Sequence, residues 1–172
     1  ITSDLRLYSN IWLVGEGVGA TIIDLQDTSG VGVLFEGTLR TIGGTISVTE
    51  GSTAVTGSST TFTNAQADDY LFIFGSSVAE GAYVQIASIT DDTNLVLKNN
   101  WLQPSRSGIG TSLVKIIKAA VNCCFKDLTV DNGANPATTA SVQIRYALNF
   151  LCENVRVIND STGEGFLIDI VG

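Results

Sequence analysis

The sequence predicts an all-β fold made of stacked, repeating strands. Three observations support this prediction: a segment near the end of the chain occurs twice, apolar residues alternate within each copy, and strand-forming residues dominate. The 172 residues are rich in Val, Ile and Thr, with 18 Gly and only two Pro. β-Branched residues favour strands, and Gly between apolar runs marks tight turns. The composition therefore favours many short strands.

The repeat joins residues 121–132 to residues 148–159. Three pairs of Asn or Asp align at a constant offset: Asn122 with Asn149, Asp127 with Asn154, and Asn132 with Asn159. Between them, apolar residues two apart also align: Leu128 with Val155, and Val130 with Val157. A spacing of two indicates a strand, and a fixed period indicates one structural unit stacked on the next.

A second pair of segments, residues 142–146 and 166–170, extends the repeat, with a shorter connecting loop in the second copy. Stacked repeats tolerate such loop differences. Stacking places Lys126 beside Glu153, and Arg145 beside Asp169. Opposite charges on neighbouring strands favour this register. The aligned Asn and Asp residues then predict a ladder of side-chain hydrogen bonds along the stack.

The start of the chain shows the same alternation. Leu5 and Leu7 alternate, and Asn10, Ile11 and Leu13 align with Asn154, Val155 and Val157. Residues 15–20 match the dinucleotide pattern G-x-G-x-x-A, but a β-branched segment follows where that pattern needs a helix. We interpret them as a glycine turn between strands.

Two further alignments extend the first coils. In the first alignment, three alternating residues match the later repeat: Val31 with Val142, Val33 with Ile144, and Phe35 with Tyr146. In the second, Ile46 and Val48 take the places of Val155 and Val157. The first coils are therefore predicted over residues 1–48, and the pattern resumes over 119–172.

These motifs resemble the right-handed parallel β-helix of pectate-lyase-like proteins, and more narrowly the phage tailspike and tail-fibre branch. The resemblance is carried by the motif Asn-x-x-x-x-Asp/Asn-Leu/Val-x-Val-x-Asn, present twice, and by the opening run 9–17. It implies a homotrimer in a virion tail, assembled in the host cytoplasm and extracellular afterwards. It also implies contacts with other tail proteins and with host surface polysaccharide.

Residues 49–118 differ in composition, with short apolar runs between Thr, Ser, Gly and Asp turns. The order of residues 55–62, 69–71, 83–89 and 93–97 resembles a small β module common in phage tail proteins. We expect an inserted β-sandwich or small barrel, with a hairpin turn at Asp91-Asp92-Thr93. The absence of Met at the start and the end at Gly172 within a repeat predict a fragment of a longer chain.

Charge and composition exclude several classes of partner. The net charge is −8 and the pI is about 4.3, which argues against nucleic acid and against anionic membrane surfaces. No apolar run is long enough to span a membrane. Cys123, Cys124 and Cys152 are expected to be buried, reduced thiols, and no metal or other cofactor is predicted.

Catalytic residues are harder to assign. Family members that cut polysaccharide use paired carboxylates, or a carboxylate with a basic residue and calcium. Glycoside hydrolysis needs two neighbouring carboxyl groups, but the aligned outward positions pair Thr129 with Arg156 and Asp131 with Ile158. No acid stacks on an acid, and the chain has no His for a catalytic triad. We assign no catalytic residue within this chain, while a pair across subunits or outside it stays open.

Two tryptophans are the predicted carbohydrate-binding residues. Trp12 lies between inward Ile11 and Leu13 and should face outward, and Trp101 lies in the loop 99–104 of the inserted module. An exposed Trp can bind a sugar, contact another subunit, or pack against a neighbouring loop. The leading hypothesis is a tail spike or fibre segment that positions recognition of a host glycan. The alternatives are a polysaccharide depolymerase, either lyase or glycosidase, and a bacterial surface adhesin.

Overall fold

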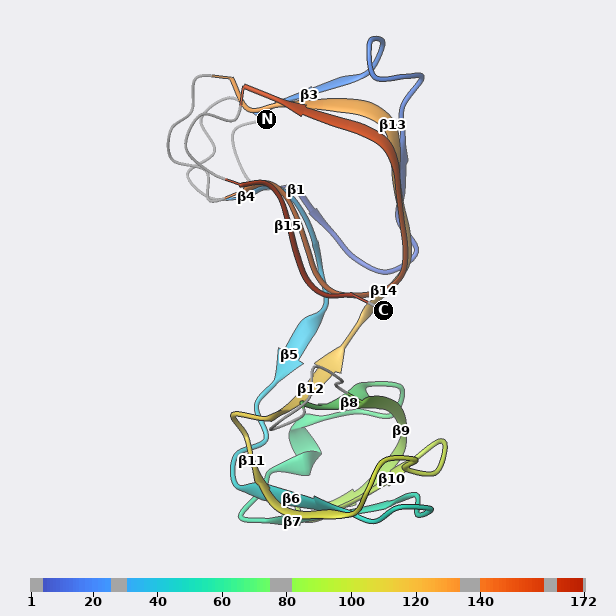
Figure 1. Cartoon of the computed structure of the whole chain (residues 1–172), viewed down its shortest axis with the longest axis vertical. Coiled ribbons are helices and arrows are strands. Elements are labelled where there is room, and N and C mark those ends of the chain that lie inside the picture. The colour runs from blue at the N-terminus through green and yellow to red at the C-terminus, as the bar shows by residue number, and fades with distance from the viewer. Residues whose placement is uncertain (1–4, 26–30, 75–81, 134–139, 160–163, 172) are drawn as a thin grey trace. The chain divides into compact units, whose positions relative to one another are not determined.

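The computed structural model describes residues 5–25, 31–74, 82–133, 140–159 and 164–171. Apart from the 3-10 turn η1 (Phe62–Asn64), its regular elements are strands. The chain divides into two compact units (Figure 1). We call residues 1–37 with 119–172 the coil unit, and residues 38–118 the inserted unit. The described residues include no helix that is long and apolar enough to cross a membrane.

The coil unit is a single parallel sheet that curls around its core (Figure 1). Its strands are β1 (Leu5–Leu7), β2 (Trp12–Val14), β3 (Ile22–Asp24), β4 (Val31–Glu36), β13 (Ala120–Asp131), β14 (Ala140–Ile158) and β15 (Glu164–Val171). The first part of β14 pairs with β4 and β15, and its second part pairs with β13. β13 pairs in turn with β2 and β3. One long strand therefore contributes to successive faces of the curled sheet.

Asn and Asp residues form the corners between these faces. Asn122 (φ 56°) and Asn149 (φ 53°) share one corner, and Asp127 (φ 57°) and Asn154 (φ 51°) share the next. Asn and Asp are enriched in this left-handed region of backbone conformation. Asn149 Nδ2 donates to Asn122 Oδ1 at 3.4 Å, and Asn154 Nδ2 donates to Asp127 Oδ1 at 2.9 Å. The predicted ladder is confirmed at both corners.

At the third predicted pair, Asn132 with Asn159, the side-chain hydrogen bond of Asn159 is made with Asp131 in place of Asn132. Asn159 Nδ2 donates to Asp131 Oδ1 at 2.8 Å, whereas the sequence predicted Asn132 as its neighbour. Asn132 is fully buried, and its backbone N–H donates to the carbonyl of Ile158 at 3.0 Å. The side chain that continues the ladder is therefore the more exposed Asp131.

The predicted alignment of the first coil is wrong. Trp12 pairs with Cys124, so Asn10 lies beside Asn122 rather than Asp127, and Asn122 Nδ2 donates to Asn10 Oδ1 at 3.3 Å. The cause is the loop 16–20, which is inserted at the corner that Asp127 and Asn154 occupy in the later coils. After this loop the register resumes, with Ile22 beside Thr129.

Two more alignments are corrected by the pairing of the strands. Val33 pairs with Val142, so β4 lies two residues away from its predicted register. The strand β6 (Thr45–Val48) does not continue the first coils, because it pairs with β7 and β11 of the inserted unit. Both errors keep the apolar side chains facing a core, which is why alternation alone could not detect them.

The core of the coil unit is apolar and aromatic. The ring of Phe35 meets Phe125 edge-on at 5.4 Å and Phe150 at 4.8 Å. Leu128 and Val130 are fully buried, as predicted, whereas Val155 and Val157 are only partly buried. In the described part of the chain, this end of β14 pairs with β13 alone.

Two expectations about burial fail. Thr129 was expected to be exposed like Arg156, but only 3% of it is accessible. The loop 16–20 explains this burial, because the carbonyl of Val18 accepts a hydrogen bond from the Thr129 hydroxyl. The three cysteines are free thiols, and Cys123 and Cys124 are buried, but Cys152 on the open part of β14 is exposed.

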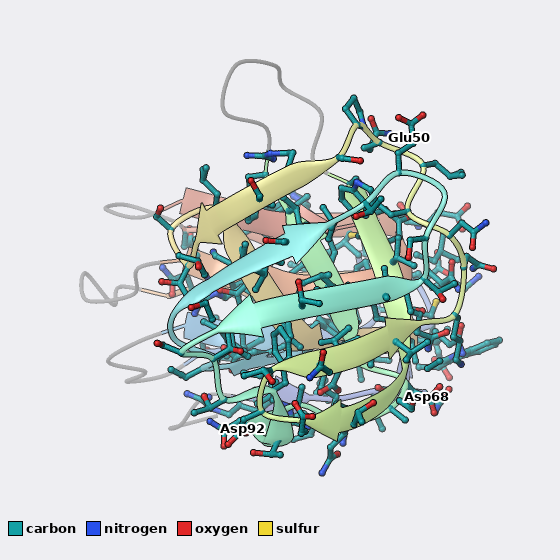
Figure 2. All side chains as sticks on the ribbon, turned by 90° about the horizontal axis from the view of Figure 1, so that it is seen from below. Glu50, Asp68 and Asp92 are labelled. Carbon is teal, nitrogen blue, oxygen red and sulfur yellow. The ribbon has the colours of Figure 1, made fainter. Side chains whose placement is uncertain are left out.

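The inserted unit is an antiparallel sheet with the strand order β11-β6-β7-β10-β9-β8-β12-β5. Besides β6, its strands are β5 (Thr38–Arg40), β7 (Ala54–Ser58), β8 (Tyr70–Ile73), β9 (Ala82–Asp91), β10 (Asn94–Leu97), β11 (Arg106–Gly110) and β12 (Val114–Lys118). They surround a separate core that includes Phe62 and Trp101. The predicted turn between β9 and β10 is confirmed, since Thr93 N–H donates to Asp91 Oδ1 at 2.7 Å. Glu50, Asp68 and Asp92 lie at well-separated places on this unit (Figure 2).

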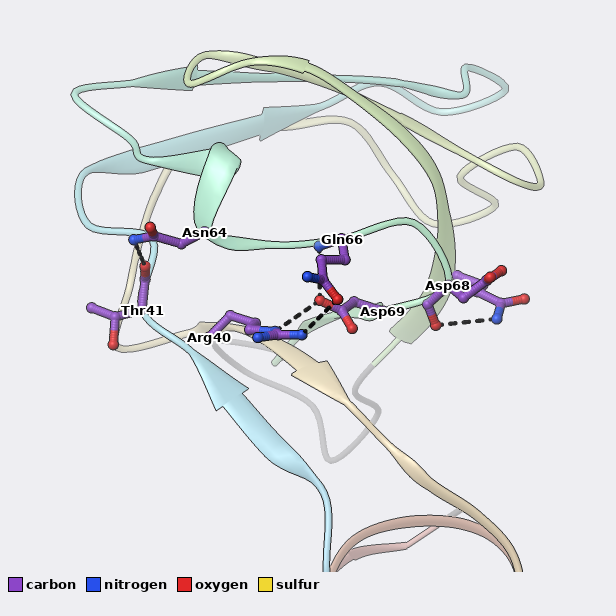
Figure 3. A network of polar contacts seen from close by, with 7 residues as sticks. Arg40, Thr41, Asn64, Gln66, Asp68 and Asp69 are labelled. Atoms are coloured by element: carbon purple, nitrogen blue, oxygen red, sulfur yellow. Dashed lines mark hydrogen bonds and ion pairs between the residues drawn. The ribbon is translucent and has the colours of Figure 1, made fainter. Parts of the chain in front are cut away.

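A polar network fastens the turn before β8 to β5 (Figure 3). Arg40 Nε donates to Asp69 Oδ2 at 3.0 Å, and Arg40 Nη2 donates to Gln66 Oε1 at 3.2 Å. The Gln66 backbone N–H donates to the same Asp69 oxygen at 2.9 Å. Asp69 is 2% exposed, so this carboxylate is buried, and its Oδ2 accepts both hydrogen bonds. The network fixes the position of the neighbouring Asp68, which adopts a left-handed conformation (φ 73°).

Candidate functional site

An open groove of about 1120 Å³ lies on the inserted unit. It is lined by Tyr70 of β8, residues 82–85 of β9, and residues 98–103 after β10. We call it the Tyr83 groove. The described residues of its lining belong to one unit, on the antiparallel sheet and the segment that follows β10.

The aromatic wall of the groove is built by strand register. β8 and β9 pair Phe72 with Tyr83 and Tyr70 with Gln85. The ring of Tyr83 stacks on Phe72, with centroids 5.2 Å apart and an interplanar angle of 21°, and lies 6.2 Å from the ring of Tyr70. Tyr83 is 49% exposed, whereas Phe72 is buried. A fixed ring backed by a buried ring therefore faces the groove.

The rest of the groove lining is mainly polar. The Lys98 backbone N–H donates to the Gln85 carbonyl at 2.8 Å, and Gln85 Nε2 donates to the Asp68 carbonyl at 3.2 Å. Lys98 Nζ pairs with Asp68 Oδ1 at 2.5 Å. The positive charge beside the groove is therefore matched by a carboxylate whose position depends on the network of Figure 3.

The segment after β10 contributes three further amide side chains to the groove lining: Asn99, Asn100 and Gln103. All three are exposed, and none forms a side-chain hydrogen bond with the described residues. An amide carries two N–H donors and one carbonyl acceptor. These side chains therefore leave their hydrogen-bonding groups available to a bound molecule.

Trp101 lines this groove, but its ring is buried. Only 2% of it is accessible, because its ring packs into the core of the inserted unit. Its Nε1 donates to the Pro104 carbonyl at 3.3 Å, and its backbone N–H donates to Ser52 at 2.8 Å. Trp101 therefore anchors the wall formed by residues 98–103, and a direct sugar contact by Trp101 stays a prediction.

Trp12 faces outward, as predicted, and is 73% exposed. It lines a smaller hollow of about 310 Å³ on the coil unit, with Cys124, Lys126 and Leu151 among its neighbours. Its Nε1 donates to the carbonyl of Asn122 at 3.2 Å. Since Trp12, Cys124 and Leu151 occupy one row across three strands, this surface is a mainly apolar stripe. Its sugar-binding role stays a prediction.

Stacked acids do occur, contrary to the sequence analysis. Asp24 of β3 pairs in register with Asp131 of β13. The misaligned first coil hid this pair from the sequence. Asp131 Oδ1 accepts hydrogen bonds from the Gly133 N–H at 2.9 Å and from Asn159 at 2.8 Å. Neither Asp24 nor Asp131 lines the Tyr83 groove or the Trp12 hollow.

Two other acids of the coil unit, Glu36 and Asp127, have cationic or amide partners. Glu36 pairs with Arg6 at 3.2 Å and with Arg145 at 3.5 Å. The Asn154 amide lowers the pKa of Asp127 by hydrogen bonding, and Lys126 contributes in the same direction. Among the described residues, no group of three or more His, Cys, Asp or Glu could hold a metal ion.

The Tyr83 groove was missed by the sequence analysis. Tyr83 and Gln85 alternate along β9 and therefore share one face of the sheet, which is a signal that the sequence carries. The neighbouring strand β8 supplies Tyr70 and Phe72, and this contribution follows from register. The aromatic wall thus depends on a pairing that local periodicity does not specify.

Comparison with known proteins identifies the fold. No family model and no curated protein sequence matches the chain. The tailspike protein gp49 from Pseudomonas phage LKA1 is similar over 99% of this chain and 29% of its own length, with 15% identity and a TM-score of 0.54. The Gp54 tailspike of Acinetobacter baumannii bacteriophage AP22, solved with A. baumannii capsular saccharide, is similar over 87% of this chain and 29% of its own, with 14% identity and a TM-score of 0.47. The chain thus spans under a third of either tailspike, and the first likeness shows that it has a tailspike-like fold.

Proposed function

We propose that this chain is a segment of a phage tailspike that binds a polysaccharide on the surface of the host bacterium. The observation that carries this proposal is the tailspike-like fold, which extends over 99% of the chain. In this proposal the coil unit is part of a right-handed parallel β-helix of the pectate-lyase-like type. The protein is a homotrimer in the virion tail and contacts other tail proteins.

The two units have complementary roles in this function. The coil unit supplies a rigid support, since its core is aromatic and its corners are tied by side-chain hydrogen bonds between strands. The inserted unit supplies exposed aromatic and amide groups in an open groove. A trimer would present three copies of any weak site, and linked sites gain avidity without new contacts.

The test is binding of the purified 172-residue chain to bacterial cells. We expect retention on a susceptible strain that is lost when the cell-surface glycans are oxidised with periodate and is kept after protease treatment of the cells. Retention that protease abolishes and periodate does not would contradict the proposal, because the receptor would then be a protein.

A second candidate is a polysaccharide depolymerase, favoured by the stacked Asp24 and Asp131. Neighbouring strands lie about 4.8 Å apart, close to the carboxyl separation of about 5–5.5 Å in retaining glycosidases. If this pair is catalytic, the chain releases reducing ends from a bound polysaccharide, and Asp24→Asn and Asp131→Asn each abolish release. Binding without release, or release by both variants, would contradict this assignment.

A further inference from the structure

We infer, on the basis of the proposed function, that the Tyr83 groove is the glycan site and that it takes an uncharged saccharide. Three features of the groove carry this inference: a half-exposed aromatic ring backed by a buried one, exposed amide groups in the same lining, and a lysine that is paired with a carboxylate. The described residues that line the groove all belong to the inserted unit.

The ring of Tyr83 has the properties of a sugar platform. Apolar C–H faces of a pyranose pack against aromatic rings, which combine a large apolar surface with a polar tip. One face of Tyr83 stacks on the buried Phe72, and Tyr70 lies beside it, so the ring is held in place before a ligand arrives. Binding then costs little side-chain entropy.

The amide groups supply the hydrogen bonds that fix a sugar in the groove. Small-molecule sites combine apolar surface with a few placed polar groups, and Asn99, Asn100 and Gln103 are the exposed groups without partners among the described residues. Each side chain offers donors and an acceptor, which suits hydroxyl and acetamido groups, since both also donate and accept.

The charge of the groove selects an uncharged ligand. Among the described residues that line the groove, Lys98 is the only charged one, and its Nζ lies 2.5 Å from Asp68 Oδ1. The chain as a whole carries a net charge of −8. An anionic capsule would therefore meet neither an unpaired cation in the groove nor a favourable long-range field.

The Trp12 hollow provides a matched comparison. It also contains an exposed aromatic ring, but its volume is about 310 Å³ against about 1120 Å³. Cys124 and Leu151 share the row of Trp12, and the two amides that line this hollow, Asn122 and Asn149, are hydrogen-bonded to each other. A Trp12→Ala variant therefore removes a comparably exposed ring from a different surface.

The experiment measures binding of the full chain to an array of bacterial surface polysaccharides that holds uncharged and anionic members. We expect wild type to bind uncharged members, with an affinity that changes less than about twofold between low and high salt, because no ion pair is formed with the ligand. Tyr83→Ala should weaken binding roughly tenfold or more, as loss of a central aromatic anchor does. Tyr83→Phe should stay near wild type, because it keeps the ring.

Two more variants separate a lost site from a lost fold. Asn100→Ala removes an exposed side chain with no hydrogen bond to the described residues, so it should weaken binding several-fold without lowering the melting temperature. Trp12→Ala tests the other predicted sugar-binding residue, and loss of binding in this variant with normal binding by Tyr83→Ala would move the site to the Trp12 hollow. Normal binding by Tyr83→Ala and Asn100→Ala would overturn the site, and selective binding of anionic members would overturn the ligand class. Both outcomes leave the proposed function standing, whereas no binding by wild type to any member would contradict the function itself.

Discussion

Asn154 donates a hydrogen bond of 2.9 Å to the carboxylate of Asp127 on the neighbouring strand, and both residues turn the chain through a left-handed conformation. The pair ties one coil to the next at a corner where the backbone changes direction. Because one partner is an acid, the strength of this tie depends on pH, unlike that of the amide pair Asn122–Asn149.

Acid should weaken the coil unit through Asp127. The Asn154 hydrogen bond, and then Lys126, lower the pKa of this carboxyl below that of an ordinary aspartate. The stabilisation is therefore fully present above about pH 4 and is lost as the pH falls through the lower pKa of the folded state. Asp127→Asn should lack this component of acid sensitivity. Urea denaturation of both proteins from neutral pH to about pH 2 measures the difference, and parallel pH profiles would contradict the assignment.

Phe125→Ala should destabilise the coil unit by about 3–5 kcal/mol, the usual cost of removing a buried Phe. Phe125 is fully buried and meets Phe35 edge-on at 5.4 Å, so the change leaves a cavity in the core. Chemical denaturation measures the loss. The control is Arg156→Ala on the exposed face, which should change stability by less than about 0.5 kcal/mol. Equal effects of the two variants would refute the inward assignment of Phe125.

Arg40→Met should destabilise the inserted unit by about 2–4 kcal/mol, because it leaves the buried carboxylate of Asp69 without its cation. The matched control is Lys98→Met, which breaks an ion pair with Asp68 whose side chains are 41% and 70% exposed. Such a pair contributes about 0–1 kcal/mol. A larger loss for Lys98→Met than for Arg40→Met would show that the Asp69 network does not fasten the turn before β8.

One thiol should react in the native chain and three after unfolding. Cys152 is exposed, whereas Cys123 and Cys124 are buried. Desolvation, and then the nearby Cys124, raise the pKa of Cys152, so its reaction with a disulfide reagent should increase at a higher pH than that of free cysteine. Stopped-flow thiol titration across pH tests both statements. Fast reaction of two or more thiols in the native chain would contradict the described burial.

Local patterns in the sequence determined the all-β class and the stacking of the later coils. The pairs Asn122–Asn149 and Asp127–Asn154 could be predicted because adjacent coils of equal length bring equivalent residues side by side. Matched strand segments of equal length also predicted Lys126 beside Glu153 and Arg145 beside Asp169. Where successive coils have no insertion between equivalent positions, one sequence offset is enough to describe the contacts between strands.

Only the tertiary structure determined the contacts in the parts of the chain where the sequence offset between coils changes. The loop 16–20 shifts the first coil, which brings Asp24 beside Asp131 and buries Thr129. Likewise, Trp101 packs inward and Tyr83 faces a groove because of how distant strands of the inserted unit pair. Alternation shows that a side chain faces one side of a strand, but it does not show what covers that side. The covering residues come from elsewhere in the chain, and their placement depends on long-range pairing that a period of two leaves unspecified.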